Sequence, residues 1–256
     1  MTRLHLVLRF HEVPQQMFES LANAVMIQDL QFGLPPGATD EEYQQSLSSL
    51  VVGDGGNGVA LRLLQNPQSR LQVLDLNGLG LEDDHFIAIV QALPASHVSK
   101  LDVGNNNIQS RAIIEFAKEL PNIQPLKSIS LGPNPWLLET SGPQCSAQSE
   151  ECWTALVEGM MGNFSVEELD AFSLVEVSAY YPHIQLLMHF LNLNRAGRHI
   201  LVTSDSIPVG LWPHVLERAG KTITYHPHQT FDLQRIRVNA VYFMVQNCPH
   251  FVMKTS

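Results

Sequence analysis

The segment whose residue types and spacing come nearest to a chemical site is the glycine-rich run Gly53-Asp54-Gly55-Gly56-Asn57-Gly58. Its glycines at 53, 55 and 58 fit the pattern G-x-G-x-x-G, between a strand-like stretch at 50–52 and a helical pattern at 59–64. In dinucleotide-binding folds such glycines let the backbone approach a pyrophosphate, and a later acid, here Asp75, holds the ribose 2′-OH. A nucleotide-binding enzyme is therefore one function that this sequence allows.

Nucleophilic and metal chemistry have weaker support in the sequence. The three cysteines, Cys145, Cys152 and Cys248, are odd in number and form no C-x-x-C pair, which favours a reducing compartment over a disulfide framework. No base is marked as a partner for any of them, and the imidazoles of His226 and His228 have no third ligand at a recognisable spacing. We therefore expect no catalytic residue, no metal and no cofactor.

Charge excludes two classes of partner and is unevenly distributed. The formal net charge is −10, from 15 Lys and Arg against 25 Asp and Glu, which disfavours nucleic acid and anionic membranes as partners. Residues 1–194 hold 8 basic and 22 acidic side chains, whereas residues 195–256 hold 7 basic and 3 acidic ones. The acidic pairs Asp83-Asp84, Glu150-Glu151 and Glu167-Glu168 are typical of solvated faces.

The sequence predicts neither a secretory signal nor a membrane span, and an organellar presequence stays open as an alternative because no acidic residue precedes Glu12. No apolar run approaches the roughly 18 residues of a membrane span. The apolar stretch near the N-terminus is short, and no small-residue cleavage site follows it. We expect a cytoplasmic protein.

An internal repeat organises the middle of the chain and sets where these side chains lie. Helix-like apolar spacing at 86–93 and 113–120 separates three copies of one strand pattern. The copies start at positions 71, 98 and 126: Leu71-x-x-Leu74-x-Leu76, Val98-x-x-Leu101-x-Val103 and Leu126-x-x-Ile129-x-Leu131.

This pattern resembles leucine-rich-repeat proteins of the long, ribonuclease-inhibitor-like kind. The family's asparagine at the ninth position is present as Asn106 and Asn134, although the first copy has Leu79 there. The resemblance implies an α/β leucine-rich-repeat solenoid with a curved parallel sheet inside and helices outside, in roughly six or seven strand–helix units. It also implies that Asn106 and Asn134 form a hydrogen-bonded ladder between neighbouring turns.

Weaker copies of the pattern at 47–52, 166–171 and 197–202 extend the repeat to both sides. We expect one leucine-rich-repeat domain over 1–256, with an N-terminal cap at 1–46 and a C-terminal cap at 208–256. The repeats then occupy 47–207, with an insertion loop near 136–148. Within the N-terminal cap, the patterns predict a strand at 3–10, a helix at 15–28 and a loop at 33–40.

Strand alternation predicts which side chains face the core and which face a partner. Leu74, Leu76, Leu101, Val103, Ile129 and Leu131 should point inward. The expected partner-binding residues on the concave face are Asp75, Asn77, Lys100, Asp102, Asn105, Lys127, Glu167, Asp170, Phe172 and Arg198.

Asp75, Asp102 and Asp170 should share one column, about 5 Å apart on adjacent strands. Carboxylates so close repel, so Lys100 and Lys127 neutralise the column, or the column serves a cationic partner. An equally good reading is that aspartate is simply a common residue at this repeat position.

The resemblance implies a non-enzymatic scaffold or adaptor that binds protein partners through the concave face, or a subunit of a larger assembly. The acidic column predicts a partner that is basic where it meets this face. The basic C-terminal end allows head-to-tail self-association of copies.

Overall fold

The computed structural model describes residues 3–7, 20, 23–24, 26–33, 51–53, 58–138, 147–171 and 181–198. Within these residues, six strands form one sheet in which every neighbouring pair is parallel and the spatial order follows the chain order. The strands are β1 (Arg3–Val7), β2 (Asp29–Gly33), β3 (Val73–Asp75), β4 (Lys100–Asp102), β5 (Ser128–Ser130) and β6 (Glu168–Asp170).

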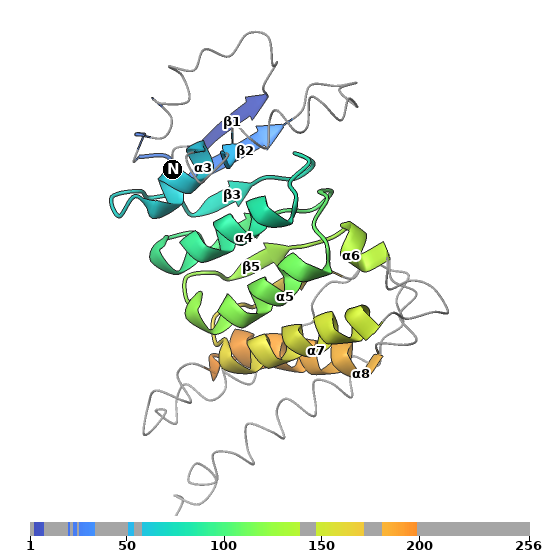
Figure 1. Ribbon diagram of the computed structural model, residues 1–256. Helices are drawn as coiled ribbons and strands as arrows, with labels where there is room; N and C mark the ends of the chain where they lie inside the picture. The colour runs from blue at the N-terminus through green and yellow to red at the C-terminus, as the bar shows by residue number, and fades with distance from the viewer. Residues whose placement is uncertain are drawn as a thin grey trace, which may run out of the picture.

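The helices cover one side of this sheet (Figure 1), and α3, α4, α5, α7 and α8 pack one on the next along the stack. They are α3 (Val59–Gln65), α4 (Asp83–Ala92), α5 (Ser110–Glu119), α6 (Pro135–Leu138), α7 (Ala147–Gly162) and α8 (Tyr181–Arg195), with 3₁₀ turns η1 (Leu93–Ala95) and η2 (Leu120–Asn122) after α4 and α5. The expected α/β class with a parallel sheet is confirmed. The sheet is not strongly curled (Figure 1), so its exposed face is flatter than the concave surface that the sequence predicts.

The core lies between the sheet and the helices. Leu30, Leu74, Leu101, Ile129 and Leu169 are register partners on neighbouring strands, and all are buried. The side chains that alternation predicted to point inward, from Leu74 to Leu131, are likewise at most 1 % exposed. Burying a leucine side chain contributes about 1.5–3 kcal/mol relative to exposing it, so this row is a main source of stability.

The period-3.6 apolar residues of the helices meet this row from the other side. Phe86 and Ile89 of α4 and Ile113 and Phe116 of α5 are fully buried. The rings of Phe86 and Phe116 lie 5.8 Å apart between centroids, which joins two successive units across the core.

The strand expected at 47–52 is not formed where the structure describes that stretch, because Val51 is helical and Val52 lies in a turn. The apolar residues Leu47, Leu50 and Val51 have the i, i+3, i+4 spacing of a helix, which explains the error. The strand beside β3 is instead β2, where Leu30 and Phe32 alternate with polar residues. β2 takes in position 33, which the sequence assigned to a loop.

Several expectations concern parts of the chain outside the described residues. They are the interior of the glycine run at 54–57, most of the insertion loop, Phe172, the strand at 199–202 and the C-terminal cap at 208–256. β1, which falls inside the strand expected at 3–10, is part of the same sheet as the repeats.

Candidate functional site: the exposed face of the sheet

The side of the sheet away from the helices carries two rows of side chains, which we call the sheet face. Each short strand from β3 to β6 buries its central residue and leaves the two flanking residues partly or fully accessible. The strand register aligns Val73, Lys100, Ser128 and Glu168 in the first row, and Gln31, Asp75, Asp102, Ser130 and Asp170 in the second.

A hydrogen-bonded network joins four of the predicted partner-binding residues at the end of the second row. The Asn77 side-chain amide donates to Asp102 Oδ1 at 3.2 Å, and the Asn105 amide donates to Asn77 Oδ1 at 3.1 Å. The backbone N–H of Asn77 donates to Asp75 Oδ1 at 3.1 Å. Amide groups therefore lie between the carboxylates, and each carboxylate is held in one orientation.

Two backbone features hold this network in place. The N–H of Gly104 donates to Asp102 Oδ1 at 2.9 Å, so the aspartate closes the turn that follows β4. Asn105 has a φ of +54°, a conformation that asparagine tolerates better than most residues. The network is consequently held in place by the protein's own backbone.

The expected acidic column is interrupted. Asp75 and Asp102 are register partners on β3 and β4, but Ser130 of β5 stands between Asp102 and Asp170. Two strand spacings separate Asp102 from Asp170, about 10 Å. The face therefore has an acidic pair and a separate acidic position, and Glu168 lies beside Asp170 on β6.

Lys127 and Glu167 do not lie in these rows, in contrast to the sequence prediction. Both precede their strands, and Lys127 Nζ lies 3.6 Å from Glu167 Oε1. The strands begin one residue later, at Ser128 and Glu168, so the strand register includes neither side chain in the two rows. An accessible ion pair of this length adds little stability, and the carboxylate that Lys127 pairs with is that of Glu167.

Arg198 does not join the sheet face either. Its guanidinium lies 4.6 Å from the ring centroid of Phe164 and 4.9 Å from that of Phe190. It donates to the carbonyl oxygens of Met160 and Met161 at the C-terminal end of α7, where a cation is favoured by the helix dipole. Burial lowers the pKa of Arg198 from its ordinary value. Its role is to cap α7.

Asn106 and Asn134 connect neighbouring units, as a ladder requires. The Asn106 side chain accepts from the N–H of Leu81 at 2.9 Å and donates to the carbonyl of Leu76 at 2.9 Å. Asn134 accepts from the N–H groups of Asn106 and Ile108 and donates to the carbonyl of Val103. Both side chains are buried, so they satisfy backbone groups that water does not reach.

A second pair of buried asparagines, which the sequence analysis did not predict, lies at the opposite ends of the strands. Asn163 donates to the carbonyl oxygens of Leu120 and Ile123, at 2.8 and 3.2 Å. Asn194 donates to the corresponding carbonyls one unit later, those of Asn163 and Val166. The available signal was an asparagine three residues before a repeat start, at 163 before 166 and at 194 before 197.

The acidic pair Asp83-Asp84 is not a freely solvated face. Arg111 Nε donates to Asp83 Oδ2 at 3.1 Å, and Arg111 Nη2 donates to Asp84 Oδ1 at 2.6 Å. The hydrogen bonds that Arg111 donates to Asp84 and to Asp83, in that order of size, raise the pKa of Arg111. Asp83 also accepts from the N–H of Gln109, so this pair joins the starts of α4 and α5.

The ends of the glycine run serve backbone packing. The N–H of Gly58 donates to the carbonyl of Val52 at 2.8 Å, and a Cβ at position 58 would lie 2.2 Å from the Val52 carbonyl carbon. Gly53 has a φ of +83°, which favours glycine. Because Val51 is helical, the strand that a dinucleotide fingerprint needs before its first glycine is not formed at 51–52.

Other candidate chemical groups are accounted for within the described residues. Cys152 is buried, and its thiol donates to the carbonyl of Ser110 at 3.4 Å. No group of three His, Cys, Asp or Glu side chains in the described ranges could hold a metal ion. Among the described helices, none combines the length and the apolar character needed to cross a membrane.

Fold and site together define a parallel α/β protein with helices on one side and a polar, accessible sheet face on the other. No family model matches the sequence, and no curated protein matches it. Among solved structures, the chain is similar to "Leiomodin-1 Actin-Binding Site 2 (ABS2)" with a TM-score of 0.51. That match has 13 % sequence identity and covers 74 % of this chain and 97 % of the other, and it shows the fold alone.

Proposed function

We propose that this chain is a leucine-rich-repeat solenoid that acts as a non-enzymatic scaffold and binds protein partners through the sheet face. The observation that carries the proposal is the network of Asp75, Asn77, Asp102 and Asn105, four polar side chains held in fixed orientations on an accessible surface. Pre-ordered side chains lose less entropy on binding, which favours association.

The repeat interpretation is supported by bonds that recur from one unit to the next. The N–H of Leu76 donates to the carbonyl of Asp102, and that of Val103 donates to the carbonyl of Ser130. Asn106 and Asn134 repeat the same side-chain bonds with an offset of one unit. In repeat proteins each unit contacts mainly its neighbours, as the helices do here.

The surface favours an adaptor over a component buried in a large assembly. A buried component would expose a broad apolar patch. Over the described residues, the large hydrophobic side chains that are exposed are Met26, Met161 and Leu186, which are scattered. We place the adaptor in the cytoplasm, because three cysteines without a paired motif suit a reducing compartment.

The partner we propose is a protein with a basic patch. Asp75 and Asp102 are adjacent, and Glu168 and Asp170 form a second acidic position on the same face. The structural neighbour is named as a binding site for a protein, which agrees with an interaction role for this architecture.

Charge reversal on the sheet face tests the proposal. We expect Asp102→Lys with Asp170→Lys to lower recovery of a partner, captured from the native source and identified by mass spectrometry, about tenfold at low salt. The control pair Gln65→Lys with Gln91→Lys adds positive charge at exposed helix positions and should leave recovery unchanged. If both pairs keep the same partners while circular dichroism is unchanged, the sheet face is not the binding surface.

The nucleotide-binding alternative is tested separately. We expect NAD, FAD and ATP to leave the melting temperature of the protein unchanged in a thermal-shift assay. A ligand present at 100 times its Kd would add about 2.7 kcal/mol to the free energy of unfolding, a shift that is readily measured. Stabilisation of that size by any of the three would contradict the scaffold proposal.

A further inference from the structure

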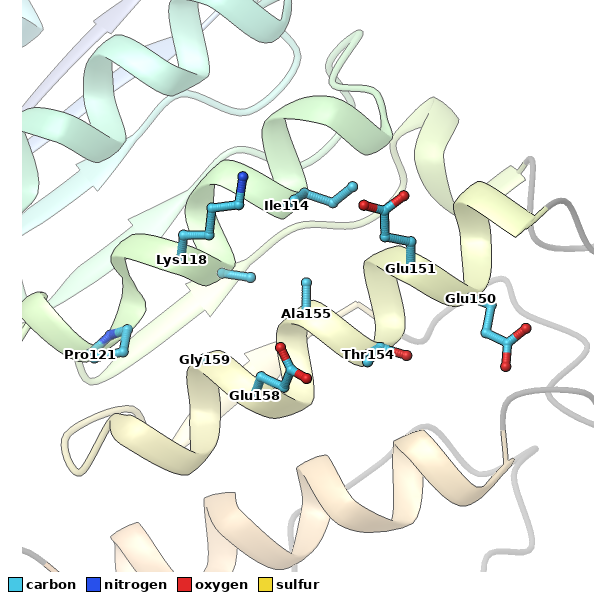
Figure 2. A pocket seen from close by; sticks show the side chains of 10 residues that line it. Ile114, Lys118, Pro121, Glu150, Glu151, Thr154, Ala155, Glu158 and Gly159 are labelled. Carbon is cyan, nitrogen blue, oxygen red and sulfur yellow. The ribbon is translucent and has the colours of Figure 1, made fainter.

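A groove runs along the helical side of the molecule, between α5 and α7 (Figure 2). Its volume is about 590 Å³, within the range of pockets that accept ligands or several side chains. Its floor is apolar or small, formed by Ile114, Ala117, Pro121, Ala155 and Gly159. It lies on the opposite side of the core from the sheet face and shares no residue with it.

The groove lies where the repeat is longest. The strand register starts at 126 and next at 166, instead of after 27 or 28 residues, and α6 and the segment to α7 fill the difference. α7 approaches α5 closely at Gly159, where a Cβ would lie 2.2 Å from the carbonyl oxygen of Ala117. Only small residues fit where the two helices come this close. Longer side chains stand on either side of this contact, and the groove lies between them.

The side of the groove that α7 supplies is acidic. Glu150, Glu151 and Glu158 line it, all three are exposed, and α7 contains no basic residue. Among the described residues, none of the three makes an ion pair. The one cation lining the groove, Lys118, is paired with Glu115 at 2.6 Å.

Helix stability does not account for all of this charge. Glu150 lies in the first turn of α7, where a carboxylate is favoured by the helix dipole. Glu158 lies four residues before the end of α7, where a negative charge is unfavourable. An acidic side chain at that place lowers the stability of the isolated helix, and an arriving cation would relieve this.

We propose that the groove between α5 and α7 is a second docking site, which accepts a basic amphipathic helix from a partner protein. Small apolar side chains of that helix rest on the floor formed by Ala117, Ala155 and Gly159. Lysine or arginine side chains from the same helix meet Glu151 and Glu158. Helix-in-groove recognition of this kind reads apolar anchors and flanking charges together.

The spacing of the acids sets the spacing of the cations. Glu151, Ala155 and Glu158 stand at i, i+4 and i+7, so they lie on one stripe of α7. Two helical turns separate the two glutamates, about 10.5 Å along the axis. A docked helix that runs alongside α7 matches them when its own basic residues are seven positions apart.

A designed peptide tests the site on the full-length chain. The probe is a fluorescein-labelled, alanine-rich helical peptide of about 18 residues with two lysines seven positions apart, and the measurement is fluorescence anisotropy at low salt. Glu151→Lys with Glu158→Lys should weaken binding at least tenfold. Glu168→Lys with Asp170→Lys makes the same change of net charge on the sheet face, and should change the affinity less than about twofold.

Any of the following results would overturn the proposal. One is no binding to the unmodified chain, or equal loss with both variants, which would reduce the effect to net charge. Another is equal binding of a peptide in which the two lysines are replaced by glutamates. A further one is carbodiimide cross-linking of Glu151 or Glu158 to Lys221 or Lys254 of the same chain or a second copy, which would assign the groove to the protein's own basic C-terminal residues.

Discussion

Between β3 and β5, buried asparagines hold the turns that follow the strands, whereas between α7 and α8 buried asparagines hold the turns that precede them. Asn106 and Asn134 stand just after β4 and β5, and Asn163 and Asn194 stand at the ends of α7 and α8. In the first region the positions three residues before the repeat starts at 98 and 126 hold Ala95 and Ile123, which have no polar side chain. Along the stack, the buried asparagines therefore move from the turns after the strands to the turns before them.

This difference shows how the backbone groups of the turns stay hydrogen-bonded when the length of a repeat unit changes. Backbone groups in turns must find partners, because burying them unpaired costs about 1–3 kcal/mol each. Regular units of 27 and 28 residues satisfy them after the strands. The longer unit that contains α7 satisfies them before β6, where its helix returns to the sheet.

The largest effect should come from breaking the ladder of the regular units. Asn134→Ala removes three bonds to the preceding unit and one within its own, and should lower the free energy of unfolding by about 4 kcal/mol. Urea denaturation measures this change. The exposed neighbour Asn107→Ala is the control, and a loss for Asn134→Ala no larger than for the control would contradict the ladder.

Breaking the bonds of Asn163 should lower the free energy of unfolding by less, and it should affect amides in a different part of the chain. Asn163→Ala removes two bonds to the preceding unit, and its other bonds stay within its own turn, so we expect a loss of about 3 kcal/mol. Hydrogen exchange should show faster amides at 163–166, with 104–108 unaffected. Asn134→Ala should show the reverse pattern. Identical exchange maps for the two variants would contradict the difference between the asparagines after the strands and those before them.

The helix contact that the longer unit creates is a third point of comparison. Gly159→Ala places a Cβ against the carbonyl oxygen of Ala117, and this overpacking should outweigh the gain in helix propensity of about 1 kcal/mol. We expect a net loss of about 1–2 kcal/mol in thermal denaturation. Gln91→Ala, at an exposed position of α4, should be neutral or slightly stabilising.

The smallest effect concerns pH and belongs to the region around α8. Burial, and then the charge of Arg198, lowers the pKa of His189 from 6.5. The unfolded chain therefore binds a proton at a higher pH than the folded chain, so stability falls as the pH drops through about 6.5 towards the lowered value. His189→Gln should flatten the curve of unfolding free energy between pH 7 and 5, which urea denaturation at a series of pH values measures; an unchanged curve would contradict the lowered pKa of His189.

Local sequence patterns predicted much of this structure. The repeat starts at 71, 98 and 126 predicted β3, β4 and β5 to within two residues of their places, because alternating burial and helical spacing are encoded locally. The network residues Asp75, Asn77, Asp102 and Asn105 were all among the expected partner-binding positions. Their bonds could not be predicted, because each depends on how neighbouring strands align.

The errors arose where one pattern fits two structures. The stretch 47–52 has an apolar spacing that serves a strand or a helix, and packing selected the helix at Val51. Arg198 was expected on the sheet because a repeat pattern continues through it. The rings of Phe164 and Phe190 and the free carbonyls of α7 offered its charge a better site.

The sequence by itself determined the parallel α/β class, the spacing of the central units and the acidic character of the body, since these depend on composition and on period along the chain. Tertiary structure decided which polar residues share a surface. Ser130 separates Asp102 from Asp170 through strand register, and Gly159 brings α7 against α5 through a contact between residues more than 40 positions apart. Such relations depend on distances in space, which a pattern read along one chain does not contain.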